Sequence, residues 1–61
     1  MMDKHEMQLK KAVDAVNNAY RSEDYDRYEA LLDRESKRFN YTRNQFEDIV
    51  TDTRLFGWDI G

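Results

Sequence analysis

The sequence predicts an all-α fold, a small antiparallel three-helix bundle formed by a single domain over residues 1–61. Apolar residues recur at the three- and four-residue spacing of amphipathic helices along the whole chain. The chain has no proline, and both of its glycines fall in the last five residues. Short connections separate three such apolar series, and helices joined by short turns pack antiparallel. The alternative is a helical hairpin plus a third helix, completed by dimerisation.

Composition predicts a folded chain of marginal stability. A domain of 61 residues buries only about 60% of the surface that its unfolded chain exposes. With no cysteine, disulfides cannot compensate. Ten basic residues nearly balance 13 acidic ones, and four Tyr and one Trp add core-forming side chains, so disorder is not indicated. A partner or a second copy is therefore expected to help complete the fold.

The first helix is predicted over residues 3–21. Its apolar stripe consists of Met2, His5, Leu9, Ala12, Val16 and Ala19. Val13 and Tyr20 widen this stripe into the core-facing side of an amphipathic helix of about five turns. The face is narrow and rich in alanine, so another helix can approach it closely.

The second helix is predicted over residues 24–39, because the apolar register slips at residues 22–24. The new series consists of Tyr25, Tyr28, Leu32, Glu35 and Phe39. Ser22 or Asp24 is suited to accept hydrogen bonds from the free N–H groups of the first turn. Acidic residues in that turn and basic residues in the last turn complement the helix dipole.

Glu35 interrupts the apolar stripe of the second helix. We expect its carboxylate to lean towards the edge of the stripe and pair with a base on the first helix, His5, Lys10 or Lys11. Such a contact would fix the register of the hairpin at some cost in stability. We interpret the residue as structural, and not as a general acid or a metal ligand.

The third helix is predicted over residues 43–56 and has the strongest local signal. Thr42 and Gln45 have the spacing of a capping box, and Tyr41 and Phe46 that of a hydrophobic staple. The expected core-facing residues are Phe46, Ile49, Val50, Thr53 and Phe56. This helix is therefore expected to pack through one apolar face.

The end of the chain supplies the candidate protein-binding residues. Gly57 is expected to stop the third helix in a left-handed conformation and to begin a short tail, residues 57–61. Leu55 lies opposite the core face, and Trp58 and Ile60 follow the stop. Together they form an apolar patch with an aromatic anchor, the residue type most common at binding hot spots. In the alternative, Trp58 folds back beneath the bundle and enlarges the core.

A basic stretch at the junction of the second and third helices is the candidate nucleic-acid site. Its residues are Lys37, Arg38, Arg43 and Asn44. The first side chains of a recognition helix read bases in the major groove, and these residue types suit that role. Acidic residues further along the third helix oppose this interpretation because they would face phosphate.

Several function classes are not indicated by the sequence. We find no candidate catalytic, cofactor-binding or metal-ligating residues, and we expect a protein that is not an enzyme and needs no cofactor. The longest apolar run has three residues, Ala30 to Leu32, so we expect no membrane partner, no signal peptide and a cytoplasmic location.

The leading functional hypothesis is a small intracellular helical protein-interaction module. It would act as a regulator, inhibitor or adaptor of another protein, which is typical of short chains from phages or mobile elements, and it could form a homodimer. The alternative is a nucleic-acid-binding regulator that uses the basic junction. An acidic mimic of nucleic acid is a third hypothesis, weakened by the arginines that interrupt the acidic face of the second helix.

Overall fold

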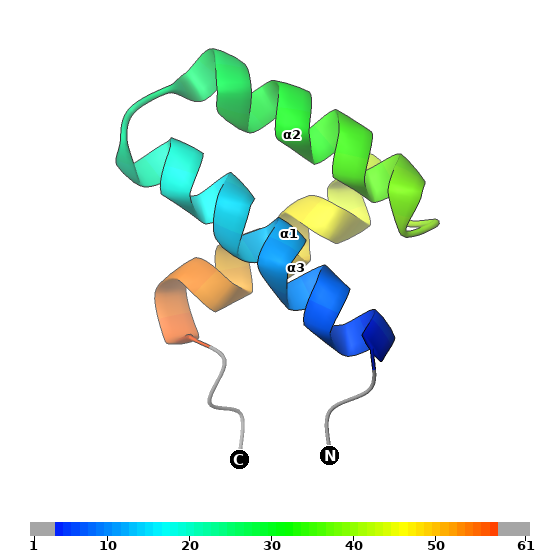
Figure 1. The fold of residues 1–61 in the computed structure, drawn as a ribbon. Helices are drawn as coiled ribbons and strands as arrows, with labels where there is room; N and C mark the ends of the chain where they lie inside the picture. Colours follow the sequence, from blue (N-terminus) through cyan, green and yellow to red (C-terminus); the bar gives the residue numbers. More distant parts are fainter. Residues whose placement is uncertain (1–3, 58–61) are drawn as a thin grey trace.

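The computed structural model describes residues 4–57, and these form three α-helices (Figure 1). The helices are α1, Lys4–Arg21, α2, Tyr25–Arg38, and α3, Arg43–Phe56. α1 and α2 form an antiparallel hairpin, and α3 crosses behind it in Figure 1. Each helix packs against the other two, so the all-α three-helix bundle is confirmed. Where the ends are described, the predicted bounds hold to within one residue.

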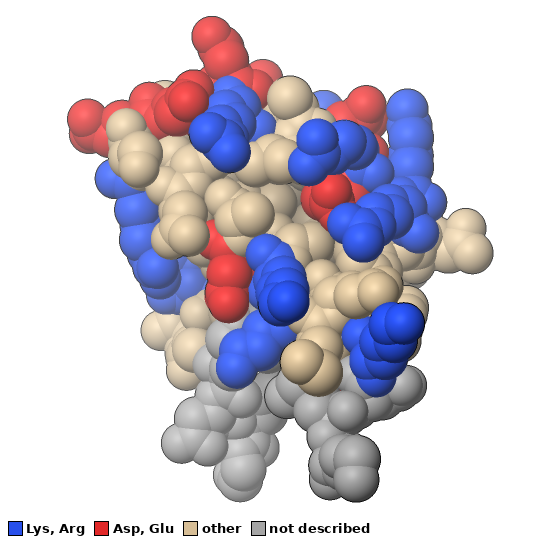
Figure 2. Space-filling view, in the orientation of Figure 1, with Lys and Arg blue, Asp and Glu red and all other residues tan. Residues whose placement is uncertain are grey.

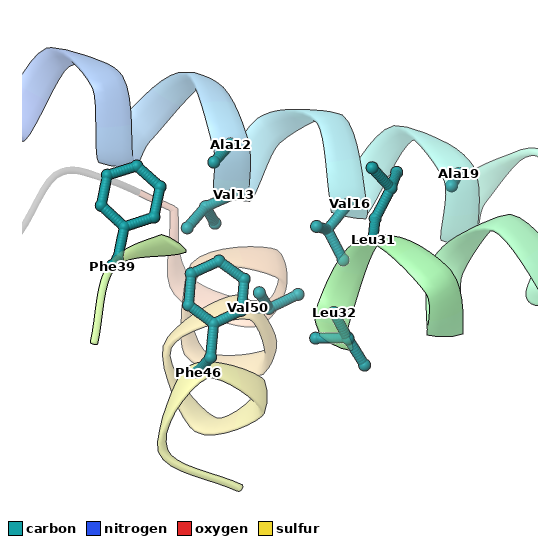
Figure 3. Packing of buried hydrophobic residues seen from close by; sticks show 9 residues of the cluster. All are labelled: Ala12, Val13, Val16, Ala19, Leu31, Leu32, Phe39, Phe46 and Val50. Carbon is teal, nitrogen blue, oxygen red and sulfur yellow. The ribbon is translucent and has the colours of Figure 1, made fainter. Parts of the chain in front are cut away.

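All three helices contribute to one core. Its fully buried large side chains are Val13 and Val16 from α1, Leu32 from α2, and Phe46 and Val50 from α3. In Figure 3 the side chains of Phe46 and Val50 point from α3 towards α1 and α2. The rest of the buried apolar cluster consists of Ala12, Ala19, Leu31 and Phe39. α3 therefore completes the core within its own chain, which favours the bundle over the hairpin alternative.

Two predicted N-caps are confirmed by their hydrogen bonds. Asp24 caps α2, and its Oδ1 accepts from the backbone N–H of Arg27 at 3.3 Å. At α3, Thr42 Oγ1 accepts from the Gln45 N–H at 3.1 Å. The Gln45 Oε1 in turn accepts from the Thr42 N–H at 3.2 Å, which completes the capping box. These bonds satisfy backbone donors that have no partner inside the helix.

The two ends of α3 also agree largely with the sequence. The rings of Tyr41 and Phe46 contact each other with centroids 6.1 Å apart, as expected for the staple. Gly57 caps the other end and donates its N–H to the carbonyl of Thr53 at 2.8 Å. Its φ is positive, 78°, but its ψ is −173°. Gly57 therefore ends α3 as predicted. Its ψ is that of an extended backbone, however, and not that of the predicted left-handed helical conformation.

Two aromatic residues expected in the core are exposed instead. Phe56 is 77% exposed and Tyr25 is 52% exposed. Each lies at the end of its helix, Phe56 in the last turn of α3 and Tyr25 at the first position of α2. The apolar spacing predicts the side of the helix on which a residue lies. It does not predict whether a neighbouring helix extends far enough to cover that residue. The assignment of Phe56 to the core was therefore wrong.

Both interhelical turns contain a non-glycine residue with positive φ. Glu23 and Asn40 each have a φ of 61°. After Glu23, the N–H of Asp24 donates to the carbonyl of Ala19 at 3.0 Å, a bond of the type that closes a helix through a left-handed residue. This conformation costs a residue with a Cβ roughly 1–2 kcal/mol. Glutamate is a poorer choice here than asparagine, which tolerates the conformation better.

Glu23→Gly is therefore expected to raise the free energy of unfolding by about 1 kcal/mol, because relief of the strained φ outweighs the extra entropy of the unfolded chain. The matched control is Asn40→Gly at the second turn, for which a smaller gain is expected. Thermal and urea unfolding followed by circular dichroism measure both variants. A Glu23→Gly protein no more stable than the wild type would contradict the strained turn.

Candidate functional site

Two large apolar side chains project from the last turn of α3. Leu55 is 67% exposed, as predicted, and Phe56 beside it is 77% exposed. We call these two residues the apolar end of α3. Of the predicted protein-binding residues, Trp58 and Ile60 lie outside the described part of the chain, so only Leu55 is placed by the structure. Phe56 was not predicted for this surface because its spacing assigns it to the core face.

Polar contacts anchor this end of α3 to α1. Asn17 is 2% exposed, and its Nδ2 donates to the backbone carbonyl of Val50 at 3.3 Å. Arg54 Nη1 donates to Asn17 Oδ1 at 3.5 Å, so one buried amide joins two turns of α3. The Arg54 guanidinium also lies over the ring of Tyr20, with its carbon 3.8 Å from the ring centroid. The last turn of α3 is thus held against α1 from two sides.

A tyrosine cluster extends this anchor to α2. The ring of Tyr20 lies edge-on to that of Tyr25, with centroids 5.7 Å apart, and tilted against that of Tyr28 at 5.3 Å. Such aromatic pairs add stability beyond the area that they bury. The end of α3 is therefore a fixed platform, and the apolar end needs little ordering before it contacts a partner.

Asn17 was missed by the sequence analysis, and its burial makes a test of the anchor possible. Asn17→Ala is expected to lower the free energy of unfolding by about 1–3 kcal/mol, because it removes two hydrogen bonds in a buried environment. The matched control is the exposed neighbour, Asn18→Ala, which should change stability by less than about 0.5 kcal/mol. Equal unfolding midpoints for the two variants would show that the amide does not hold α3.

The structure divides the basic junction that was the candidate nucleic-acid site. Its cations lie near carboxylates, in the pairs Lys37–Asp33 at 3.4 Å, Arg38–Glu35 at 3.2 Å and Arg43–Glu29 at 4.0 Å. Arg38 lines a hollow between α1 and α2, whereas Lys37 and Arg43 pair with the other side of α2. Asn44 is exposed in the first turn of α3. The exposed carboxylates of Asp33 and Glu29 beside Lys37 and Arg43 weaken the attraction of the junction for phosphate.

Glu35 is buried, at 3% exposed, and forms two ion pairs. Its Oε1 accepts from Arg34 Nε at 3.1 Å, and its Oε2 accepts from Arg38 Nη1 at 3.2 Å. The expectation of a basic partner is confirmed, but both of these partners belong to α2 and not to the first helix as predicted. His5 contacts a different neighbour, the ring of Phe39, with centroids 5.6 Å apart.

Metal and membrane sites find no support in the described residues. Among residues 4–57, no three His, Asp or Glu side chains gather closely enough to hold a metal ion. No helix in the same range combines the length and the apolar character needed to cross a bilayer.

Comparison with known proteins finds no family model, curated protein or solved structure that matches this chain.

Proposed function

We propose that this protein is a helical protein-interaction module that regulates, inhibits or adapts another protein through the apolar end of α3. The observation that carries the proposal is the exposure of Leu55 and Phe56, two consecutive residues in the last turn of α3. Hydrogen bonds between Asn17 of α1 and both Val50 and Arg54 hold this end of α3 in place. Aromatic side chains such as Phe are enriched at protein–protein interfaces, so an exposed Phe beside a second apolar side chain is suited to anchor a partner. Burying them against a partner removes apolar surface from water at about 25 cal/mol per Å².

The nucleic-acid alternative has less support. The three cations of the basic junction lie beside carboxylates and point to different sides of α2. Self-association through the apolar end is a further outcome to test, because a second copy would bury the same two side chains.

Affinity capture from a lysate of the native host, with and without nuclease, tests the proposal. Tagged wild-type protein is expected to retain one stoichiometric protein that survives nuclease, and the double variant Leu55→Ser/Phe56→Ser should lose it. Met7→Ser, which removes an exposed apolar side chain from α1, is the matched control and should retain it.

Two results would contradict the proposal. If the captured proteins disappear after nuclease treatment, the binding depends on nucleic acid. Capture that is unchanged in the Leu55→Ser/Phe56→Ser variant would show that the apolar end is not the binding surface. Sedimentation velocity of the same proteins separates a homodimer from a complex with another protein.

A further inference from the structure

A groove lies between α1 and α2. It contains two hollows of about 220 and 240 Å³, and Ala15 lines both of them. The α1 wall is formed by Gln8, Lys11, Ala15 and Asn18, and Ser22 extends it in the turn that follows. Ala12 and Ala19 also line the hollows, and such short side chains allow a docked helix to approach closely. Each hollow is smaller than the roughly 300–1,000 Å³ of small-molecule sites, so the groove suits the side chains of a docked chain.

The α2 wall of the groove presents a row of arginines. Arg27, Arg34 and Arg38 are seven and four residues apart, which places them on one edge of the helix. Along the axis they are separated by roughly 10 Å and 6 Å, at about 1.5 Å per residue. Lys11 adds a fourth cation from the opposite wall. Carboxylates four and seven residues apart on another helix have the same separations.

The carboxylates that line the groove are already engaged. Asp24 caps α2 and accepts from the Arg27 N–H. Glu35 is buried, and its two oxygens hold the guanidiniums of Arg34 and Arg38 in place. A guanidinium has five N–H donors, and both side chains are more than half exposed. The buried carboxylate therefore orients two arginines at the groove while leaving further donors for a ligand.

Acidic residues occupy the other edge of α2. Asp26, Glu29 and Asp33 follow a spacing of three and four, which we call the outer acidic row. In Figure 2 most acidic side chains gather along the upper edge of the molecule, whereas Lys and Arg dominate the face formed by α1 and α2, with acidic side chains also lying among them. A broad polyanion such as a nucleic-acid duplex would meet both edges, and the outer acidic row would repel it. A single helix, about 10–12 Å across with its side chains, would present a much narrower charged surface than a duplex.

We propose that the groove between α1 and α2 binds an acidic amphipathic helix of a partner protein. Carboxylates on one face of that helix pair with the arginine row and Lys11, and its small apolar side chains enter the two hollows. This inference rests on the proposed function as a protein-binding module, but it uses a different surface and specifies the chemistry of the partner.

Fluorescence anisotropy with a synthetic peptide tests the groove directly. The probe is a labelled helical peptide of about 18 residues, with Glu at spacings of four and seven on one face and Ala and Leu beside them. Its control is the same peptide with Gln in place of every Glu. The acidic peptide is expected to bind at least about tenfold more tightly than the Gln peptide. The uncharged Gln side chains cannot form the charge-assisted hydrogen bonds that Glu forms with the arginine row. Equal affinities would overturn the proposal.

Two variants locate the binding without disturbing the Glu35 ion pairs. Ala15→Glu places a carboxylate where the hollows meet, and Lys11→Gln/Arg27→Gln removes two cations. Each is expected to weaken binding of the acidic peptide by about tenfold, with the helical circular dichroism retained. Arg21→Gln lowers the net charge by one unit, as Ala15→Glu does, but outside the groove lining, and this control is expected to bind like the wild type. Folded groove variants that bind like the wild type would overturn the proposal.

The outcomes also separate this inference from the proposed function. A single-stranded oligonucleotide that binds more tightly than the acidic peptide, and loses affinity in the groove variants, would overturn the helix proposal in favour of nucleic acid. Peptide binding without capture of any host protein would support the groove and contradict the role of the apolar end. Capture through the apolar end without peptide binding would contradict the groove alone.

Discussion

Phe46→Ala is expected to unfold the protein at room temperature or bring it close to unfolding. Phe46 is fully buried and points from α3 into the shared core (Figure 3). Truncation of a buried Phe costs about 3–5 kcal/mol, because the transfer free energy is lost and a cavity remains. A chain of this length has a total stability of roughly 3–9 kcal/mol, at about 0.05–0.15 kcal/mol per residue. Urea unfolding followed by circular dichroism measures the loss.

Phe56→Ala is the matched control for Phe46→Ala, because it removes the same side chain from an exposed position on the same helix. Its unfolding midpoint should lie within about 0.5 kcal/mol of the wild type. A large loss of stability in Phe56→Ala would show that this ring belongs to the core, as its spacing predicted. The apolar end of α3 would then not be an exposed surface. Midpoints independent of protein concentration would further exclude the dimer-completed hairpin as the folded form.

Leu32→Ala is expected to lower the free energy of unfolding by about 2–5 kcal/mol. Leu32 is fully buried, and it is the one α2 residue among the fully buried large side chains of the described core. Its loss leaves a cavity that α1 and α3 fill only in part. Leu55→Ala, at the apolar end of α3, is the matched control and should have little effect on stability. Similar losses for the two leucines would contradict the register in which α2 packs.

The helices and their starts could be predicted from the sequence because local signals determine them. The apolar spacing marks all three helices, and Thr42 with Gln45 defines the start of α3 to the residue. The break after α1 was placed correctly, although the positive φ of Glu23 was not foreseen, since no glycine signals it. Local signals thus predict the elements and most of their ends.

The candidate site depends on tertiary packing, which the sequence pattern does not report. Burial of Asn17 follows from the crossing of α1 by α3, and nothing in the spacing of α1 marks that amide as a bridge. Exposure of Phe56 follows from how far the other helices reach. The Glu35 pairs went to α2 because arginines one residue before and three residues after it are close on the same helix. The misses at Asn17 and Phe56 thus concern a contact between helices and the reach of a helix, whereas the miss at Glu35 concerns ion pairs within one helix.

The two proposed surfaces have different physical characters. The apolar end of α3 gains its binding free energy from burial of exposed side chains, so its binding should depend little on salt. The groove between α1 and α2 presents charge, so its binding should weaken as salt screens the arginine row. Measuring capture at low and high salt therefore indicates which surface dominates for a given partner.

Site-specific photo-crosslinking tests whether the apolar end of α3 contacts another protein. A photoreactive benzoyl-phenylalanine replaces Phe56 in the full chain, in cells of the native host. The control replaces Glu29, which is exposed on the outer acidic row. We expect the photoreactive residue at position 56 to form one protein adduct, which the same residue at position 29 does not form. No adduct from position 56, or the same adducts from both positions, would contradict this expectation.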